Sequence, residues 1–132
     1  MMGFSELRLN RIAHPEVASP MRHAVAAFLA ASGRVDDDRS DDILTAVGEA
    51  LANVVEHAYE GTDHREIELL AHLENNDTLP IDVFDRGTFI ERPPRPNRGF
   101  GMKIVKAIAQ NVTVDVGDGT HVRMIFRLSA AQ

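Results

Sequence analysis

A glutamate and an asparagine one helical turn apart are the first side chains in this sequence that could act together. Glu49 and Asn53 lie in a segment with helical periodicity, and His57 follows at the same spacing. A carboxylate can accept a proton from an attacking hydroxyl group, and a carboxamide oxygen suits Mg²⁺, which prefers oxygen ligands. The helix pattern alone, however, favours the ordinary interpretation that this polar row is the wet face of an amphipathic helix.

Two further groups of residues could contact a bound ligand. Asp85 and Gly87 follow an apolar run, so that the carboxylate can accept a hydrogen bond from an exocyclic amine while the glycine lets a flat ring approach the backbone. Gly99 and Gly101 open a helical pattern, where exposed N–H groups and the helix dipole favour an anion. Each signal is weak alone, because glycine-rich turns and helix entries are common.

The elements that must position these residues can be read from the hydrophobic periodicity. It predicts helices over residues 15–33 (starting at Pro15 or Pro20), 41–58 and 103–110, and strands over residues 7–12, 67–73, 80–84, 112–116 and 122–128. In the second helix, the inward stripe is expected to be Ile43, Val47, Leu51, Val54 and Ala58. Because the strands come largely in adjacent pairs, we expect an α+β fold: a two-layer sandwich whose mixed, mostly antiparallel sheet is covered on one face by about three helices.

Length and composition limit the classes of function. The 132 residues are expected to form a single domain over residues 1–132, with enough apolar residues (44%) to bury a core. The chain has no cysteine, which excludes disulfide and thiolate chemistry, and its net charge of −6 makes direct nucleic-acid binding unexpected. No apolar run approaches the ~20 residues that span a bilayer, and the N-terminus lacks a secretory signal, so we expect a cytoplasmic protein.

The order and spacing of the motifs are more specific than any one of them. "EALANVVEHAY", "DRGTF", "RGFGMKI" and "GTHVRM" resemble, in sequence, the N box, G1 box, G2 box and terminal threonine motif of the ATPase superfamily that includes gyrase and the histidine kinases. Over Leu7–Leu128 the chain resembles the bacterial anti-sigma factor serine kinases in particular. The resemblance implies the Bergerat ATP-binding fold.

The resemblance also implies a role for each motif residue. Glu49 matches the general base, Asn53 the Mg²⁺ ligand, and Asp85 the acceptor for the adenine amino group. The match also implies Gly87 beside the ring, Gly99 and Gly101 near the phosphates, and Thr120, which completes the adenine pocket through water. Arg98 and Met102 are expected as further ATP-binding positions. His57 is expected to support the site rather than to react.

The implied activity is that of an ATP- and Mg²⁺-dependent serine/threonine kinase in a partner-switching pathway. Its implied substrate is an anti-sigma-factor antagonist with a STAS-type domain, and its other partner is a sigma factor. Arg22 matches an arginine that the family uses to contact protein partners, although a solvated helix charge is an equally simple interpretation. A homodimer is common in the family.

The sequence departs from the family pattern in two places. The G1 box lacks the second glycine of D-x-G-x-G, and the segment matching the ATP lid, residues 88–98, is short and contains three prolines, with Arg92, Arg95 and Arg98 as its basic residues. Because prolines oppose helix formation, we expect a short irregular lid. An alternative function is therefore a module that binds nucleotide weakly or not at all and acts by titrating its partners. A histidine kinase catalytic domain is less favoured, because no helix with a phosphoacceptor histidine precedes the motifs.

Overall fold

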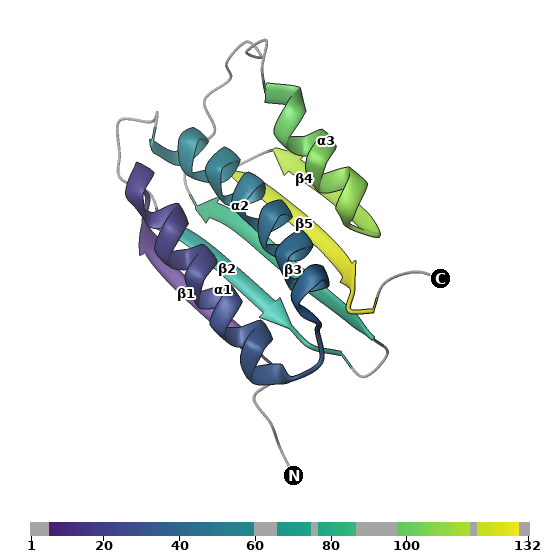
Figure 1. Ribbon diagram of the computed structural model, residues 1–132. Coiled ribbons are helices and arrows are strands. Elements are labelled where there is room, and N and C mark those ends of the chain that lie inside the picture. The colour runs from purple at the N-terminus through teal and green to yellow at the C-terminus, as the bar shows by residue number, and fades with distance from the viewer. Residues whose placement is uncertain (1–5, 60–65, 75–76, 87–97, 117–118, 130–132) are drawn as a thin grey trace.

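Five strands and three α-helices make up the described part of the chain, and the helices cover one face of the sheet (Figure 1). The structure, a computed structural model, describes residues 6–59, 66–74, 77–86, 98–116 and 119–129. In chain order the elements are β1 (Glu6–Ile12), a 3₁₀ turn (Pro15–Val17), α1 (Ala18–Ser32), α2 (Asp37–Tyr59), β2 (Glu66–His72), β3 (Thr78–Arg86), α3 (Arg98–Ile108), β4 (Asn111–Val116) and β5 (Thr120–Arg127).

The sheet has the strand order β1-β2-β3-β5-β4. Each of its four pairings is antiparallel. The predicted fold class, an α+β two-layer sandwich with a mostly antiparallel sheet under about three helices, is therefore confirmed. The long connection from β3 to β4 carries α3, so that β5 returns to pair between β3 and β4.

Alternation along the two central strands decides which side chains face the helices. On β5, Val122, Met124 and Phe126 are fully buried between more exposed neighbours. On β3, the same alternation buries Leu79, Ile81 and Val83. Because side chains in a strand point to opposite faces in turn, Asp85 and Thr120 continue the helix-facing rows of these two strands. Two polar residues are thus placed at the end of an otherwise apolar layer.

The central helix, α2, begins at Asp37, earlier than the start predicted at residue 41. The prediction was wrong there because the acidic residues Asp37 and Asp38 already belong to the first helical turn. The Asp36 carboxylate accepts a hydrogen bond from the backbone N–H of Arg39 at 2.7 Å, which is an N-terminal cap. Asp37 and Asp38 lie in the first turn, where negative charge stabilises the helix dipole.

Burial on α2 extends beyond the predicted stripe. Ile43, Val47, Leu51 and Val54 are fully buried as expected, whereas the side chain of Ala58 lies outside the described residues. Ala46 and Ala50 are fully buried as well, because α2 lies between α1 and α3 on the sheet (Figure 1). About half of the circumference of the helix is therefore in contact with protein.

The other two helices differ from prediction mainly at their N-terminal ends. α1 begins after the 3₁₀ turn that contains Pro15, so Pro20 lies in its first turn, and it ends as expected at Gly33, whose φ of 66° is left-handed. α3 begins at Arg98 rather than at residue 103. Gly99 and Gly101 are consequently inside the first turn of α3 instead of preceding it.

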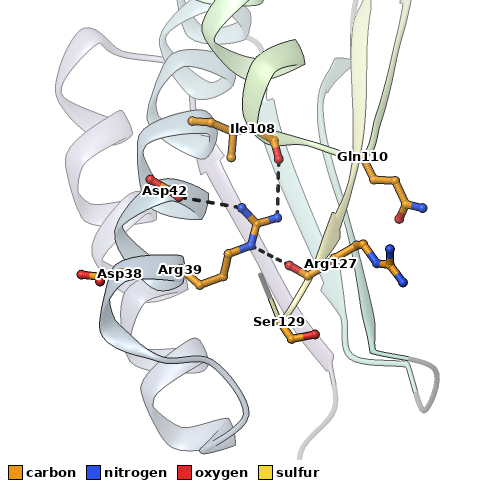
Figure 2. Close-up of a pocket in the computed structure, with 7 residues that line it drawn as sticks. All are labelled: Asp38, Arg39, Asp42, Ile108, Gln110, Arg127 and Ser129. Carbon is orange, nitrogen blue, oxygen red and sulfur yellow. Dashed lines mark hydrogen bonds and ion pairs between the residues drawn. The ribbon is translucent and has the colours of Figure 1, made fainter. Parts of the chain in front are cut away.

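One arginine joins the N-terminal end of α2 to the ends of α3 and β5 (Figure 2). The Arg39 guanidinium donates hydrogen bonds to the Arg127 carbonyl at 2.7 Å and to the Ile108 carbonyl at 3.5 Å, and it lies 3.9 Å from the Asp42 carboxylate. Only 14% of the Arg39 side chain is exposed. A largely buried arginine that bonds two backbone carbonyls fixes the position of α3 against the sheet.

No helix in the described ranges has both the length and the apolar character needed to cross a membrane.

The contacts of Arg39 predict a loss of stability when they are removed. We expect Arg39→Ala to lower the free energy of unfolding by about 1–3 kcal/mol, because the Ile108 and Arg127 carbonyls both lose their donor and the first of these bonds is partly buried. Arg39→Lys should restore only part of this, since an ammonium lacks the planar fork of a guanidinium. Urea unfolding followed by circular dichroism measures the change.

A matched control for this experiment is Arg11→Ala. Arg11 is exposed, and its hydrogen bond goes to the carbonyl of the adjacent Asn10. This substitution should change stability by less than about 0.5 kcal/mol. Equal losses in the two variants would show that Arg39 does not hold the elements together.

Candidate functional site

The side of α2 that faces α3 is marked by Arg39, which bonds the last carbonyl of α3. At about 100° per residue, Asn53 lies about 40° from Arg39 around the axis of α2, and Glu49 lies about 80° from it. Gly48 lies on the opposite edge, where it contacts α1 through Arg22. Glu49 and Asn53 are both half-buried. The polar row is therefore not a fully wet face: it borders a neighbouring helix.

The first turn of α3 lies level with this row. α2 and α3 run side by side in opposite directions (Figure 1). Arg39 on α2 touches Ile108, the last residue of α3. At ~1.5 Å per residue, ten residues back along α3 lead to Arg98 and ten residues forward along α2 lead to Glu49. The turn that contains Gly99 and Gly101 is thus brought beside Glu49 and Asn53.

A buried polar pair lies at the end of the two central strands. Asp85 is 5% exposed and Thr120 is 3% exposed, and the backbone N–H of Thr120 donates a hydrogen bond to Oδ1 of Asp85 at 3.0 Å. Both side chains belong to the helix-facing rows of β3 and β5. The C-terminal end of β3 lies at the same end of the sandwich as the C-terminal half of α2 and the start of α3 (Figure 1). The structure thus brings Asp85 and Thr120 into contact.

Gly119 is a site residue that the sequence reasoning missed. Its φ of 147° is one that side chains rarely adopt, and a Cβ atom here would lie 2.2 Å from Oδ1 and 2.5 Å from the carbonyl oxygen of Asp85. Only glycine lets the backbone come this close to Asp85. The sequence "GDGT" is typical of a turn. It does not reveal this close contact, because the residue that the glycine must accommodate is distant in the sequence.

The remaining nucleotide-site predictions are placed in part. Arg98, Gly99 and Gly101 belong to the first turn of α3, although nothing is described of the Arg98 side chain. Met102 is half-buried and packs against the core. Gly87, the predicted lid up to residue 97 and the side chain of His57 lie outside the described residues. The arrangement thus supplies a buried acceptor, a glycine-containing helix start and two polar side chains on α2.

Arg22 occupies a different surface from this group. It is half-buried on α1, and its Nε donates a hydrogen bond to the Leu44 carbonyl of α2 at 3.1 Å. A Cβ atom on Gly48 would lie 3.3 Å from Cδ of Arg22, so the arginine stem lies directly over this glycine. No ion pair involves the Arg22 guanidinium within the described ranges. The described contacts of Arg22 therefore hold it against α2 through its Nε and its stem.

A cavity of about 440 Å³ lies at the opposite end of α2, around Arg39 (Figure 2). It is lined by Asp38, Arg39, Asp42, Ile108, Gln110, Arg127 and Ser129. None of the predicted site residues lines this cavity. Among the described residues, no three histidine, aspartate or glutamate side chains are grouped as metal ligands. A Mg²⁺ ion held chiefly by phosphates and water needs only one or two protein oxygens, which the Asn53 carboxamide fits.

Comparison with known proteins places this arrangement in a family. A family model described as the histidine kinase-like ATPase domain matches residues 12–126. The anti-sigma F factor of Pasteuria penetrans is 33% identical over 126 residues, covering 84% of this chain and 83% of the relative. The anti-sigma F factor of Clostridium beijerinckii is 25% identical over 138 residues (96% and 95%), and the serine-protein kinase RsbW of Listeria monocytogenes is 25% identical over 135 residues (90% and 85%).

Solved structures agree with these relatives. A crystal structure of the RsbU and RsbW domains of a Mycobacterium tuberculosis protein is similar with a TM-score of 0.76 and 26% identity, covering 93% of this chain and 32% of that longer one. The histidine kinase domain of a blue-light activated kinase from Erythrobacter litoralis shares the fold, with a TM-score of 0.59 at 17% identity over 84% of this chain and 61% of that one. The chain belongs to the histidine kinase-like ATPase family, within its group of anti-sigma factor serine kinases.

Proposed function

We propose that this protein binds Mg·ATP and transfers the γ-phosphoryl group to a serine or threonine of an anti-sigma-factor antagonist. The observation that carries the proposal is the buried Asp85–Thr120 pair, which faces the helices at the end of the sandwich where Glu49, Asn53 and the start of α3 meet. Relatives named anti-sigma F factor and serine-protein kinase RsbW support the same activity at the level of the family.

The adenine base would be recognised at the sheet. The Asp85 carboxylate already accepts one N–H group from Thr120, and it can accept a second hydrogen bond from the exocyclic amino group of adenine. Fully buried Val54 and half-buried Met102 belong to the two helices that border this end. A mostly apolar site with a few placed polar groups is what binds a flat base.

The phosphates would lie along the start of α3. The first N–H groups of a helix have no partner within it, and glycines at positions 99 and 101 let a ligand approach them closely. Arg98, at the first position of the helix, would supply a positive charge to the phosphates. The Asn53 carboxamide would hold Mg²⁺ there, and the ion would neutralise charge on the phosphates.

Glu49 would act as the general base. It is half-buried on the α3-facing edge of α2, one turn before Asn53. In the reaction the carboxylate takes the proton of the substrate hydroxyl, the oxygen forms a bond to the γ-phosphorus, and the bond to the bridging oxygen of ADP breaks. Catalysis of this kind consists mainly of positioning and charge stabilisation, so the contribution of each group depends on its alignment.

Phosphorylation would switch partners through charge. A phosphoserine adds roughly −1.5 to −2 charges at pH 7 and would disfavour the interface with an acidic protein, here of net charge −6. The antagonist, which we take to have a STAS-type domain, would then dissociate and leave the kinase to hold its sigma factor. We assign Arg22 to partner contact and place this exchange in the cytoplasm. The family precedent also makes a homodimer part of the proposal.

A specific observation keeps one alternative open. The segment that matches the ATP lid, residues 88–98, is short and has three prolines. Prolines oppose helix formation, so this sequence does not favour a helical lid that excludes water from the nucleotide. In that case the protein would bind nucleotide weakly and act by titrating its partners. The likeness to the Erythrobacter litoralis histidine kinase domain concerns the fold alone and does not favour phosphotransfer to histidine.

Nucleotide binding separates these two functions. We expect titration calorimetry with Mg·ADP to give a Kd below about 1 mM, which corresponds to about −4 kcal/mol. Asp85→Ala should weaken binding at least about tenfold, because a buried hydrogen bond to a charged group is lost. The absence of measurable binding by the wild-type chain would favour the titration module.

Replacement of Glu49 tests the catalytic step. Glu49→Gln keeps the size of the side chain but removes the base, so we expect phosphotransfer to the cognate antagonist to fall about 10²–10⁴-fold while Mg·ADP affinity changes little. Labelled ATP and the purified antagonist provide the assay. Glu56→Gln, at an exposed position farther along the same helix, is the matched control and should retain transfer. Undiminished transfer by Glu49→Gln would exclude Glu49 as the base.

Replacement of Arg22 tests the partner surface. We expect Arg22→Ala to weaken binding of the antagonist or the sigma factor about tenfold or more, as arginines central to an interface do. Affinity for Mg·ADP should not change, because the contacts that the structure describes for Arg22 are to Leu44 and Gly48 and not to the proposed nucleotide-site residues. His23→Ala, exposed on the same helix, is the control. Partner affinity that is unchanged in Arg22→Ala would assign the residue to helix packing alone.

A further inference from the structure

We propose that Gly119 and the backbone N–H of Thr120 set the base specificity of the site by fixing the orientation of the Asp85 carboxylate. The inference rests on the proposed nucleotide binding and names the residues that would make the site select a base with an exocyclic amino group. Gly119 is a positioning residue in this account, since it would act through Asp85 rather than touch the base.

The first step concerns the rotation of the carboxylate. Asp85 ends the helix-facing row of β3, and its Oδ1 accepts the N–H of Thr120 at 3.0 Å in a buried environment. A hydrogen bond is directional, and it weakens steeply away from linearity. The plane of the Asp85 carboxylate is therefore set by the backbone of β5, and the direction in which the group can accept a further hydrogen bond is set with it.

The second step concerns the backbone that brings this N–H into place. The regular pairing of β3 with β5 ends at Phe84 and His121, and Thr120 pairs with Val116 on the other side. At Gly119 the chain turns against Asp85 so closely that a Cβ atom would lie 2.2 Å from Oδ1 and 2.5 Å from the Asp85 carbonyl oxygen. A side chain at position 119 would push away either the carboxylate or the N–H that holds it.

The third step concerns Thr120 itself. The resemblance assigned its side-chain hydroxyl to the adenine pocket, whereas the contact that the structure describes uses its backbone. The two contributions are separable: the backbone N–H orients Asp85, and the hydroxyl is left for the ligand. The orientation of Asp85 therefore depends on Gly119, because a side chain at this position would prevent the hydrogen bond between Thr120 and Asp85.

The chemical consequence is a preference among purines. An oriented carboxylate accepts a hydrogen bond from an amino group but repels the carbonyl oxygen that hypoxanthine carries at the same ring position. A site built to bond one polar group rejects an analogue that lacks it by a large factor, because its own buried group is then left unsatisfied. If the carboxylate can rotate, it no longer presents a fixed acceptor to either base, and the preference for adenine over hypoxanthine falls.

The test compares the affinities for Mg·ADP and Mg·IDP by titration calorimetry. We expect the wild-type protein to prefer ADP at least about tenfold. In Gly119→Ala this ratio should fall to about threefold or less. The matched control is Gly33→Ala: Gly33 also has a positive φ, of 66°, but a Cβ atom there meets nothing within 4 Å and the residue ends α1 far from Asp85. It should lose stability through backbone strain and keep the wild-type ratio.

The outcomes are distinguishable. A folded Gly119→Ala variant that keeps the wild-type ratio overturns the inference, while a wild-type protein that binds neither nucleotide overturns the proposed function instead. Where Gly119→Ala does not fold, replacing the amide of Thr120 by an ester removes only the N–H donor. A lowered ADP to IDP ratio in that protein supports the inference, and an unchanged ratio overturns it. Asp85→Asn, whose amide can donate to the hypoxanthine carbonyl, gives the reference for lost discrimination.

Discussion

The burial of α2 is the constraint on which the rest of this structure depends. α2 packs on the sheet and is flanked by α1 and α3, so that about half of its surface is covered by protein (Figure 1). Ala46 and Ala50, both fully buried, let its backbone come close to its neighbours. The burial of apolar surface stabilises the folded state by roughly 25 cal/mol for each Å². It also fixes the orientation of the helix about its own axis. Every polar residue on α2 is thereby assigned to a definite edge.

The two edges of this helix have different roles. On one edge, Gly48 receives the stem of Arg22, whose Nε bonds the Leu44 carbonyl and ties α1 to α2. On the other edge, Arg39 bonds the end of α3, and Glu49 and Asn53 come level with its start. The proposed nucleotide site and the proposed partner surface therefore lie on different sides of the same helix. A partner that bears on Arg22 is in contact with the element that carries the proposed general base, without entering the nucleotide site itself.

Local patterns predicted most of the fold because they depend on neighbours in the sequence. The alternation on β5 and the apolar spacing of Ile43, Val47 and Leu51 each report a buried face directly, and the structure confirms both. The start of α2 was placed too late because its apolar spacing begins only at Ile43, whereas the helix begins at Asp37, directly after the Asp36 cap. Helical spacing could not decide whether Glu49 is exposed to solvent or belongs to a binding site, because that depends on where α3 packs.

Gly119 shows the limit of sequence reasoning most clearly. A glycine before a strand is explained locally by a turn, and nothing near it in the sequence indicates that Asp85, on another strand, fills the space a side chain would need. That requirement exists only after β3 and β5 have paired. Asp85 is therefore oriented only in the folded state. A nucleotide that bonds this carboxylate would bind only the protein in which β3 and β5 are paired. Because a ligand that binds the folded state alone stabilises it, adenine recognition at Asp85 would also stabilise the central pair of strands.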